Sequence, residues 1–142
     1  MTDVAGRIRV GLADDAVEIR ALVRLSLELD GRFDVVGEAE DGAAAVELAR
    51  TQRPDVLVLD LAMPVMDGLQ AMPLVRRASP ATAIVVLSGF DARRMEQRAL
   101  RSGASAYVEK GALLDRLADA IAGAGSGARG AAAGESCRLA DP

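Results

Sequence analysis

The fold of this 142-residue chain is decided by residues 56–68, which read VLVLDLAMPVMDG. Val56–Leu59 is continuously apolar and rich in β-branched residues, a pattern typical of a strand that is covered on both faces. Ile84–Leu87 repeats this pattern further along the chain. Strands of this kind belong to parallel sheets with helices on both sides, and Asp60 comes directly after the first of them. The sequence therefore predicts an acidic group at the end of a central buried strand.

Three further strands and five helices are expected around these two. Amphipathic helical segments follow each apolar run, and five strand–helix units in a row predict a parallel sheet with helices on both faces, an α/β fold. The other expected strands are Ile8–Ala13, Asp34–Glu38 and Ser105–Glu109. The expected helices are 16–30, Gly42–Arg53, 69–78, 92–102 and 112–122.

The chain has the length of one domain, predicted over residues 7–122. The last 20 residues, 123–142, contain five glycines and six alanines with almost no apolar periodicity. This composition predicts a flexible Gly/Ala-rich tail or linker. Pro73 falls inside the expected helix 69–78, which should therefore start late or be kinked.

Composition excludes several classes of protein. The chain has no histidine and a single cysteine, so histidine-based catalysis, zinc clusters and an intramolecular disulfide framework are ruled out. The net charge is −4 and the arginines are scattered, so we expect no nucleic-acid contact by this chain. The sequence shows no apolar run near 18 residues and no signal sequence, which predicts a soluble cytoplasmic protein without membrane contact.

Polar side chains follow four of the five predicted strands. They are Asp14 and Asp15 after the first strand, Asp60 after the third, Ser88 after the fourth and Lys110 after the fifth. The carboxyl ends of parallel strands meet at one edge of the sheet, which is where ligands bind in folds of this type.

Three neighbouring carboxylates repel one another and call for a divalent cation, and an all-oxygen site suits Mg²⁺. Lys110, the only lysine among 17 basic residues, adds a point charge, and Ser88 adds a hydroxyl donor. Both groups suit the oxygens of a phosphoryl group. The simplest chemistry is attack of Asp60 on phosphorus to give an aspartyl phosphate.

Four motifs together resemble the receiver domain of two-component response regulators. They are Asp14-Asp15, the run LVLDLAMPVMDG at 57–68, Leu87-Ser88-Gly89, and Tyr107 three residues before Lys110. They occur in order and with suitable spacing over roughly residues 7–122. The resemblance implies a flavodoxin-like, doubly wound (βα)5 fold with a five-stranded parallel sheet in the order 2-1-3-4-5.

The resemblance also implies a role for each motif residue. Asp60 would accept a phosphoryl group from the phosphohistidine of a sensor histidine kinase or a phosphotransfer protein, and Lys110 and Ser88 would hold the phosphoryl oxygens. Ser88 and Tyr107 would form a switch pair. Mg²⁺ would be held by Asp14, Asp15, Asp60 and the Ala62 backbone carbonyl.

The chain would therefore be a signalling switch rather than an enzyme, acting on a downstream protein or on a fused output domain. It is either a stand-alone receiver or the receiver part of a longer regulator. The sequence departs from the family at Gly111, where proline often follows the lysine. Ala62 and Phe90 lack a group that could orient water, which predicts slow loss of the phosphoryl group.

Alternative interpretations remain open. Asp15 and Glu18 have the spacing of a helix-capping pair, so Asp15 has a purely structural explanation as well as a functional one. A Mg²⁺-dependent phosphatase of the haloacid-dehalogenase type also forms an aspartyl phosphate, but it needs a second Asp two residues after the first, where this chain has Ala62. A phosphorylation-independent interaction module is the third possibility.

Overall fold

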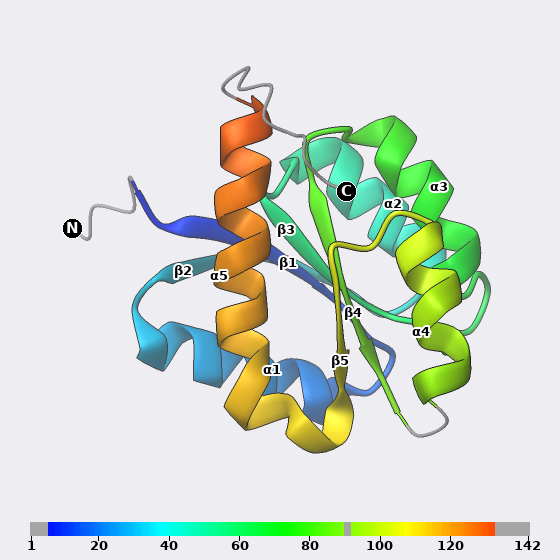
Figure 1. Ribbon diagram of the computed structural model, residues 1–142, viewed down its shortest axis with the longest axis horizontal. Coiled ribbons are helices and arrows are strands. Elements are labelled where there is room, and N and C mark those ends of the chain that lie inside the picture. Colours follow the sequence, from blue (N-terminus) through cyan, green and yellow to red (C-terminus); the bar gives the residue numbers. More distant parts are fainter. Residues whose placement is uncertain (1–5, 90–91, 133–142) are drawn as a thin grey trace.

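The fold is a five-stranded sheet whose strands alternate with helices along the chain (Figure 1). It was obtained as a computed structural model, which describes residues 6–89 and 92–132. The strands are β1 (Ile8–Ala13), β2 (Phe33–Ala39), β3 (Val56–Asp60), β4 (Ala83–Ser88) and β5 (Ala106–Glu109). The helices are α1 (Val17–Asp30), α2 (Gly42–Gln52), α3 (Gly68–Ala78), α4 (Ala92–Arg101), a short 3₁₀ turn η1 (Lys110–Ala112) and α5 (Leu113–Ala132).

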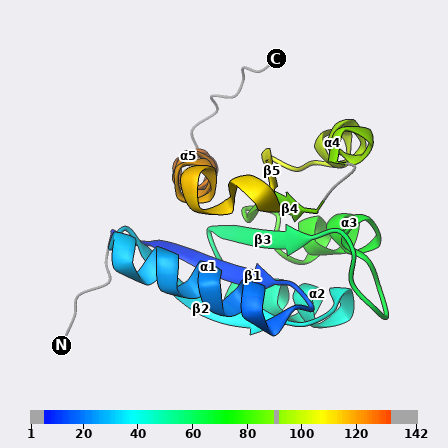
Figure 2. The same cartoon turned by 90° about the horizontal axis from the view of Figure 1, so that it is seen from below.

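The strand order is β2-β1-β3-β4-β5, and every neighbouring pair is parallel (Figure 2). The predicted flavodoxin-like fold and its strand order are therefore confirmed. All five predicted strands form within one residue of their expected bounds. From β1 the chain adds β2 on one side of the sheet and then β3, β4 and β5 on the other. The place between β1 and β3 is the topological switch point, where ligands bind in folds of this class.

The two faces of the sheet have separate hydrophobic cores, because the central strands are covered on both sides. On one face, α1 and α5 pack through side chains such as Val23, Leu27 and Ile121. On the other face, α2, α3 and α4 contribute Leu48, Met72 and Ala99 among others. All five residues of β3 are buried, as its uninterrupted apolar pattern predicts.

Helix α3 begins at Gly68 although Pro73 lies within it, so the expected late start is wrong. Asp67 and Gln70 form a capping box: the Asp67 carboxylate accepts from the Gln70 N–H at 2.8 Å, and the Gln70 side chain accepts from the Asp67 N–H at 3.0 Å. These two bonds satisfy donors that the first turn of a helix leaves free, and they fix the start of α3.

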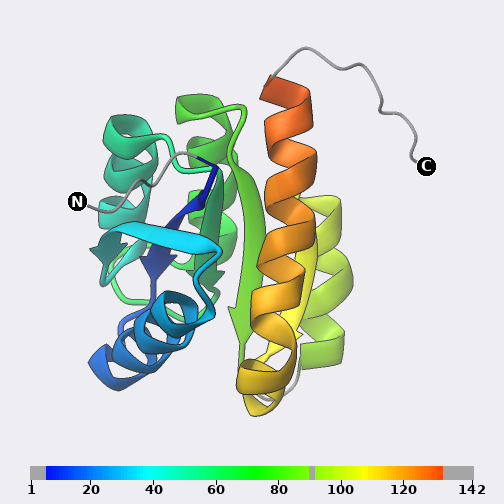
Figure 3. The same cartoon turned by 90° about the vertical axis from the view of Figure 1, so that its left-hand side faces the viewer.

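Helix α5 continues to Ala132, ten residues beyond its expected end at residue 122, so the prediction of a flexible tail from residue 123 is wrong over 123–132 (Figure 3). At Gly125, close packing against the sheet favours this extension, although glycine has a low helix propensity. Gly125 is buried against Ile8 and Val56, and a methyl group there would lie 2.8 Å from Ile8 Cγ2. Glycine lets the helix approach the sheet closely enough to offset its cost of about 1 kcal/mol within a helix. Residues 133–142 of the predicted tail lie outside the described residues.

None of the helices within the described ranges is long and apolar enough to cross a membrane.

Candidate functional site

The polar residues predicted at the strand ends do meet at one edge of the sheet. Asp14 follows β1, Asp60 ends β3, Ser88 ends β4, and Lys110 follows β5. Asp14, Asp60 and Ser88 are each buried to more than nine-tenths of their surface. Buried polar groups are costly unless they have partners, so their concentration at one edge points to a binding site.

The three carboxylates of Asp14, Asp15 and Asp60 form one cluster. Each offers an oxygen that lies within 4.8 Å of the others. Burial, followed by the nearby charge of Asp14, raises the pKa of Asp60 to about 6. Carboxylate oxygens at this spacing are a donor set that fits a hard divalent cation such as Mg²⁺, and exposed Asp15 leaves the cluster open to solvent.

Lys110 supplies the positive charge that faces this cluster. Its ammonium Nζ lies 3.0 Å from Asp14 Oδ2 and 3.4 Å from Asp60 Oδ2. Burial works to lower the pKa of Lys110, but the two carboxylates outweigh it, and the pKa lies above its ordinary value. The lysine is therefore held protonated between two acids, with a quarter of its side chain still exposed.

The turn after β1 holds Asp14 by its backbone and its carboxylate. The Asp14 N–H donates to the Ala39 carbonyl of β2 at 3.0 Å, and Asp14 Oδ1 accepts from the Ala16 N–H at 2.9 Å. The residue that caps α1 is Ala16, without a side-chain capping bond, so the capping interpretation of Asp15 is wrong. Within the described ranges the Asp15 side chain has no hydrogen bond or ion pair, which leaves its carboxylate free for a ligand.

The loop between β3 and α3 is closely packed around Asp60. Asp60 Oδ1 accepts from the Ala62 N–H at 3.3 Å, and a methyl group on Gly68 would lie 2.3 Å from the Asp60 carbonyl oxygen. Val65 adopts a φ of 69°, where β-branched residues are rare, and the Met66 N–H donates to the Pro64 carbonyl across it at 2.7 Å. The loop that follows Asp60 therefore contains a strained turn.

Ser88 and Tyr107 lie on the neighbouring strands β4 and β5, whose register pairs Val86 with Tyr107. The Tyr107 hydroxyl oxygen is buried and makes no hydrogen bond of good geometry within the described ranges. Burial raises the pKa of Tyr107, and the nearby Ser88 hydroxyl acts in the opposite direction. The tyrosine packs against the core on the α4 side, and its hydroxyl lies near that of Ser88.

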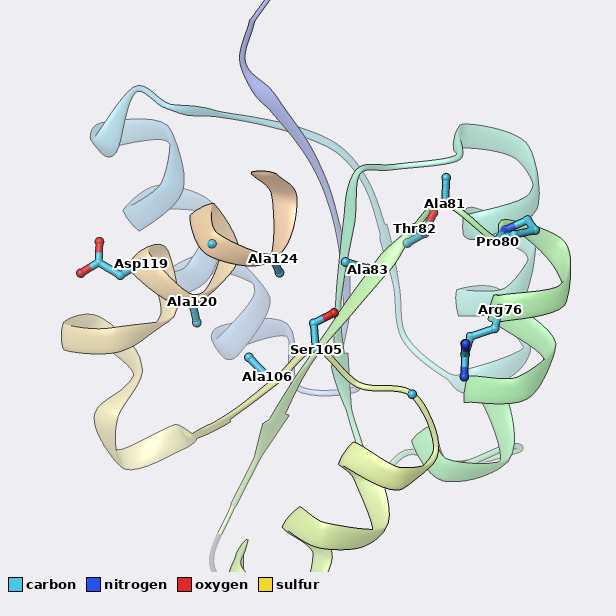
Figure 4. A pocket seen from close by; sticks show the side chains of 12 residues that line it. Arg76, Pro80, Ala81, Thr82, Ala83, Ser105, Ala106, Asp119, Ala120 and Ala124 are labelled. Carbon is cyan, nitrogen blue, oxygen red and sulfur yellow. The ribbon is translucent and has the colours of Figure 1, made fainter. Parts of the chain in front are cut away.

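A hollow of about 570 Å³ lies at the other end of the strands (Figure 4). Ala83 and Ala106, the first residues of β4 and β5, line it, together with Asp119 of α5 and Arg76 of α3. Most of its lining consists of alanine, glycine and small polar residues. None of the three carboxylates of the acidic cluster lines it.

The match to a family model decides between the families that share this fold. Residues 10–122 match the model of the response regulator receiver domain. This chain belongs to the response regulator receiver family. The resemblance stated from the four motifs is thereby confirmed.

The relatives differ in how much of their length this chain covers. The probable transcriptional regulatory protein NarL of Mycobacterium tuberculosis is 37 % identical over 81 % of this chain and 53 % of its own length. The chemotaxis protein CheY of Bacillus subtilis is 34 % identical over 80 % of this chain and 93 % of its own length. This chain thus spans about half the length of the first regulators it matches, and nearly all of a chemotaxis protein.

Solved receiver structures agree with this assignment. The signal receiver domain of the putative response regulator NarL from Mycobacterium tuberculosis has a TM-score of 0.74 at 35 % identity, covering 87 % of this chain and 98 % of that one. The receiver domain of AraT from Geobacillus stearothermophilus has a TM-score of 0.78 at 36 % identity, covering 88 % and 98 %.

The structure brings Asp14, Asp15, Asp60 and Lys110 together as predicted, and Ser88 ends the neighbouring strand β4. Ala62 lies in the loop after Asp60 with an exposed side chain, and Phe90 lies outside the described residues. No peptide bond in the described ranges is cis, including the one between Lys110 and Gly111. Sequence reasoning missed Arg20, whose guanidinium reaches the Asp14 carbonyl from α1. A bond from a side chain to a backbone atom six residues earlier leaves no signal in a residue pattern.

Proposed function

We propose that this receiver accepts a phosphoryl group on Asp60 in a Mg²⁺-dependent reaction and thereby switches a protein-interaction surface. The observation that supports this most directly is the position of Asp60. Its buried carboxylate belongs to a cluster with Asp14 and Asp15, and it lies 3.4 Å from the ammonium of Lys110. A nucleophile placed beside one fixed cation and one cation-binding cluster is the arrangement that phosphoryl transfer needs.

In the proposed transfer, an Asp60 carboxylate oxygen attacks the phosphorus of a phosphohistidine. A phosphorus–oxygen bond forms as the phosphorus–nitrogen bond breaks, and the histidine nitrogen leaves with the bonding electron pair. The 142 residues contain no histidine, so the phosphohistidine lies outside them, on a sensor kinase or a phosphotransfer protein. Lys110 stabilises the charge on the phosphoryl oxygens, and the Ser88 hydroxyl donates a hydrogen bond to one of them.

The residues that would hold Mg²⁺ are Asp14, Asp15, Asp60 and the backbone carbonyl of Ala62. When bound, the cation supplies charge neutralisation for the acidic cluster and for the incoming phosphoryl oxygens. Asp15 is the most accessible of the three carboxylates, and the Asp14 carboxylate already forms an ion pair with Lys110. Asp15 and Asp60 are therefore the expected direct ligands, with Asp14 holding a water molecule of the metal.

The switch is proposed to connect Ser88 with Tyr107. A phosphoryl group adds about −1.5 to −2 charges and new acceptor oxygens at Asp60, which draws the Ser88 hydroxyl toward it. The space and the hydrogen-bonding partner available to the Tyr107 hydroxyl then change, since Ser88 lies close to it. The surface formed by α4, β5 and α5 would carry this change to a downstream protein or a fused output domain.

Acetyl phosphate with Mg²⁺ tests this function on the full chain, with Asp60→Asn as the matched control. We expect a phosphoryl mass increment on the parent protein, seen by intact mass spectrometry, and none on the variant. No increment on the parent, or an equal increment on the variant, would contradict the proposal. The first result would favour a phosphorylation-independent interaction module, and the second would place the acceptor elsewhere.

An aspartyl-phosphate phosphatase is less well supported, because the residue two positions after Asp60 is Ala62, which has no proton to donate to a leaving group. If the parent protein hydrolysed many molecules of acetyl phosphate per chain, the phosphatase would become the better supported function. A cytoplasmic location is part of the proposal and is checked by cell fractionation.

A further inference from the structure

Arg20 ties α1 to the turn that follows β1 and to the end of β2. Its Nη1 donates to the Asp14 carbonyl oxygen at 2.6 Å, and its Nε donates to Glu38 Oε1 at 2.8 Å. Only 15 % of its side chain is exposed. Both bonds involve an ionised group, so they are stronger than bonds between neutral partners, and they fix the guanidinium at two points.

The Asp14 carbonyl belongs to the peptide unit that joins Asp14 to Asp15. A peptide unit is planar, so fixing its carbonyl also fixes the direction from which the chain enters Asp15. The Asp15 carboxylate is exposed and has no hydrogen bond or ion pair in the described part of the chain. Its position is consequently set by the backbone, and the side chain that holds this peptide is Arg20.

We propose that Arg20 is a positioning residue that directs the Asp15 carboxylate toward the bound divalent cation. This inference rests on the Mg²⁺ site of the proposed function. Groups that orient metal ligands without touching the metal commonly change metal affinity by about 10–100-fold when they are removed. Arg20 meets this description through the Asp14–Asp15 peptide.

Charge alone predicts the opposite effect, which makes the proposal testable. A guanidinium near three carboxylates repels an incoming cation, so its removal should strengthen Mg²⁺ binding if charge were all that mattered. Glu38 neutralises much of that charge through its bond with Arg20. Loss of positioning weakens Mg²⁺ binding, whereas loss of charge strengthens it.

Arg24 provides a matched control one turn further along α1. Its Nε also donates to Glu38, at 2.8 Å, and its Nη1 donates to Glu28, at 3.3 Å, but in the described part of the chain it makes no hydrogen bond to Asp14. Arg20→Met and Arg24→Met therefore remove the same charge from the same carboxylate, and both keep an unbranched side chain. We expect Arg20→Met to raise the Mg²⁺ dissociation constant about tenfold in calorimetric titration of the full chain. Arg24→Met should leave it unchanged or slightly lower it.

A double-mutant cycle with Asp15→Asn shows whether Arg20 acts through Asp15. In the Asp15→Asn background, Arg20→Met should have no further effect on Mg²⁺ affinity. Equal affinity in the parent and Arg20→Met, equal weakening by both arginine variants, or full additivity with Asp15→Asn would each overturn the proposal. Unfolding in EDTA checks that the variants are folded. If Arg20→Met is not, Arg20→Lys replaces it, because a lysine keeps the charge but cannot bridge Asp14 and Glu38 with a planar fork.

The outcome for the parent protein separates the two proposals. A parent that binds no Mg²⁺ contradicts the proposed function and this inference with it. A parent that binds Mg²⁺ and accepts a phosphoryl group, while Arg20→Met binds equally well, contradicts this inference alone.

Discussion

The ammonium of Lys110 lies nearer to Asp14 than to Asp60, with Nζ 3.0 Å from Asp14 Oδ2 and 3.4 Å from Asp60 Oδ2. In this structure the lysine therefore forms ion pairs with both acids rather than with Asp60 alone. A phosphoryl group on Asp60 would compete with Asp14 for it. The compact, rotatable ammonium can change partners without moving the strand that carries it.

Lys110→Arg should still accept a phosphoryl group but switch poorly. The guanidinium keeps the charge, so the mass increment with acetyl phosphate should persist. The guanidinium is wide and planar and does not fit the space between Asp14 and Asp60. The side chain at position 110 should therefore move less readily from Asp14 to the phosphoryl group. Amide NMR spectra recorded before and after phosphorylation measure the switch. A variant with the parent's full set of spectral changes would contradict the role assigned to Lys110.

Asp60→Asn should stabilise the protein at neutral pH when no divalent cation is present. The pKa of Asp60 is raised to about 6 in the folded chain, mainly by burial, against an ordinary value of 3.8. Between these values the folded state holds a proton that the unfolded state has lost, so stability falls as pH rises through this window and stays reduced above it. Asparagine removes this cost, which is about 1–3 kcal/mol.

Urea unfolding in EDTA measures this difference as a function of pH. The advantage of Asp60→Asn should be greatest above pH 6, shrink as the pH falls toward 3.8, and vanish well below 3.8, where the parent carboxyl is protonated in both states. A variant less stable than the parent at neutral pH would show that the attraction of Lys110 outweighs burial and the charge of Asp14.

The parts of this site that follow from strand position were predictable from sequence. An apolar run that ends in Asp60 fixes where that acid lies, because the ends of parallel strands meet at one edge. The same reasoning placed Ser88 and Lys110. The capping interpretation of Asp15 failed because the N-cap of α1 is the next residue, Ala16, and a difference of one residue in a helix boundary is smaller than spacing can resolve.

Contacts that depend on packing were not predictable. The composition of residues 123–132 indicates a flexible segment, yet the chain is helical there, and Gly125 packs closely against Ile8 and Val56. Whether a glycine is a flexible point or a site of close approach depends on a neighbour more than 60 positions away in sequence. The bond from Arg20 to the Asp14 carbonyl is hidden for a similar reason, since any residue type supplies a carbonyl.

Tyr107→Phe should leave the unphosphorylated protein equally stable or stabilise it by up to about 1 kcal/mol. The Tyr107 hydroxyl is buried without a hydrogen bond of good geometry, and removing an unsatisfied polar group removes its desolvation cost. Urea unfolding of the parent and the variant tests this. A clear loss of stability would mean that the hydroxyl is bonded, with Ser88 as the partner at hand, and Ser88→Ala should then cause the same loss.

Val65→Asn should stabilise the protein by about 1 kcal/mol. Val65 has a φ of 69°, which is unfavourable for a β-branched residue, and its side chain is 82 % exposed, so little packing is lost. Asparagine has no branch at Cβ and occurs at positive φ more often than valine does. Val65→Ile is the matched control, because it keeps the branch at Cβ and should bring no gain. Equal thermal unfolding temperatures for the parent and Val65→Asn would contradict the strain at this turn.

Ala62→Gln should shorten the lifetime of the phosphorylated state. The Ala62 side chain is exposed two residues after Asp60 and offers no group that orients a water molecule for attack on phosphorus. An amide at this position supplies one, and we expect hydrolysis to accelerate about tenfold, which corresponds to about 1.4 kcal/mol of barrier. Ala62→Leu has similar bulk without hydrogen-bonding groups and should hydrolyse no faster than the parent. Decay of the phosphoryl mass increment after removal of acetyl phosphate gives the rates, and a parent lifetime of only seconds would contradict the role assigned to Ala62.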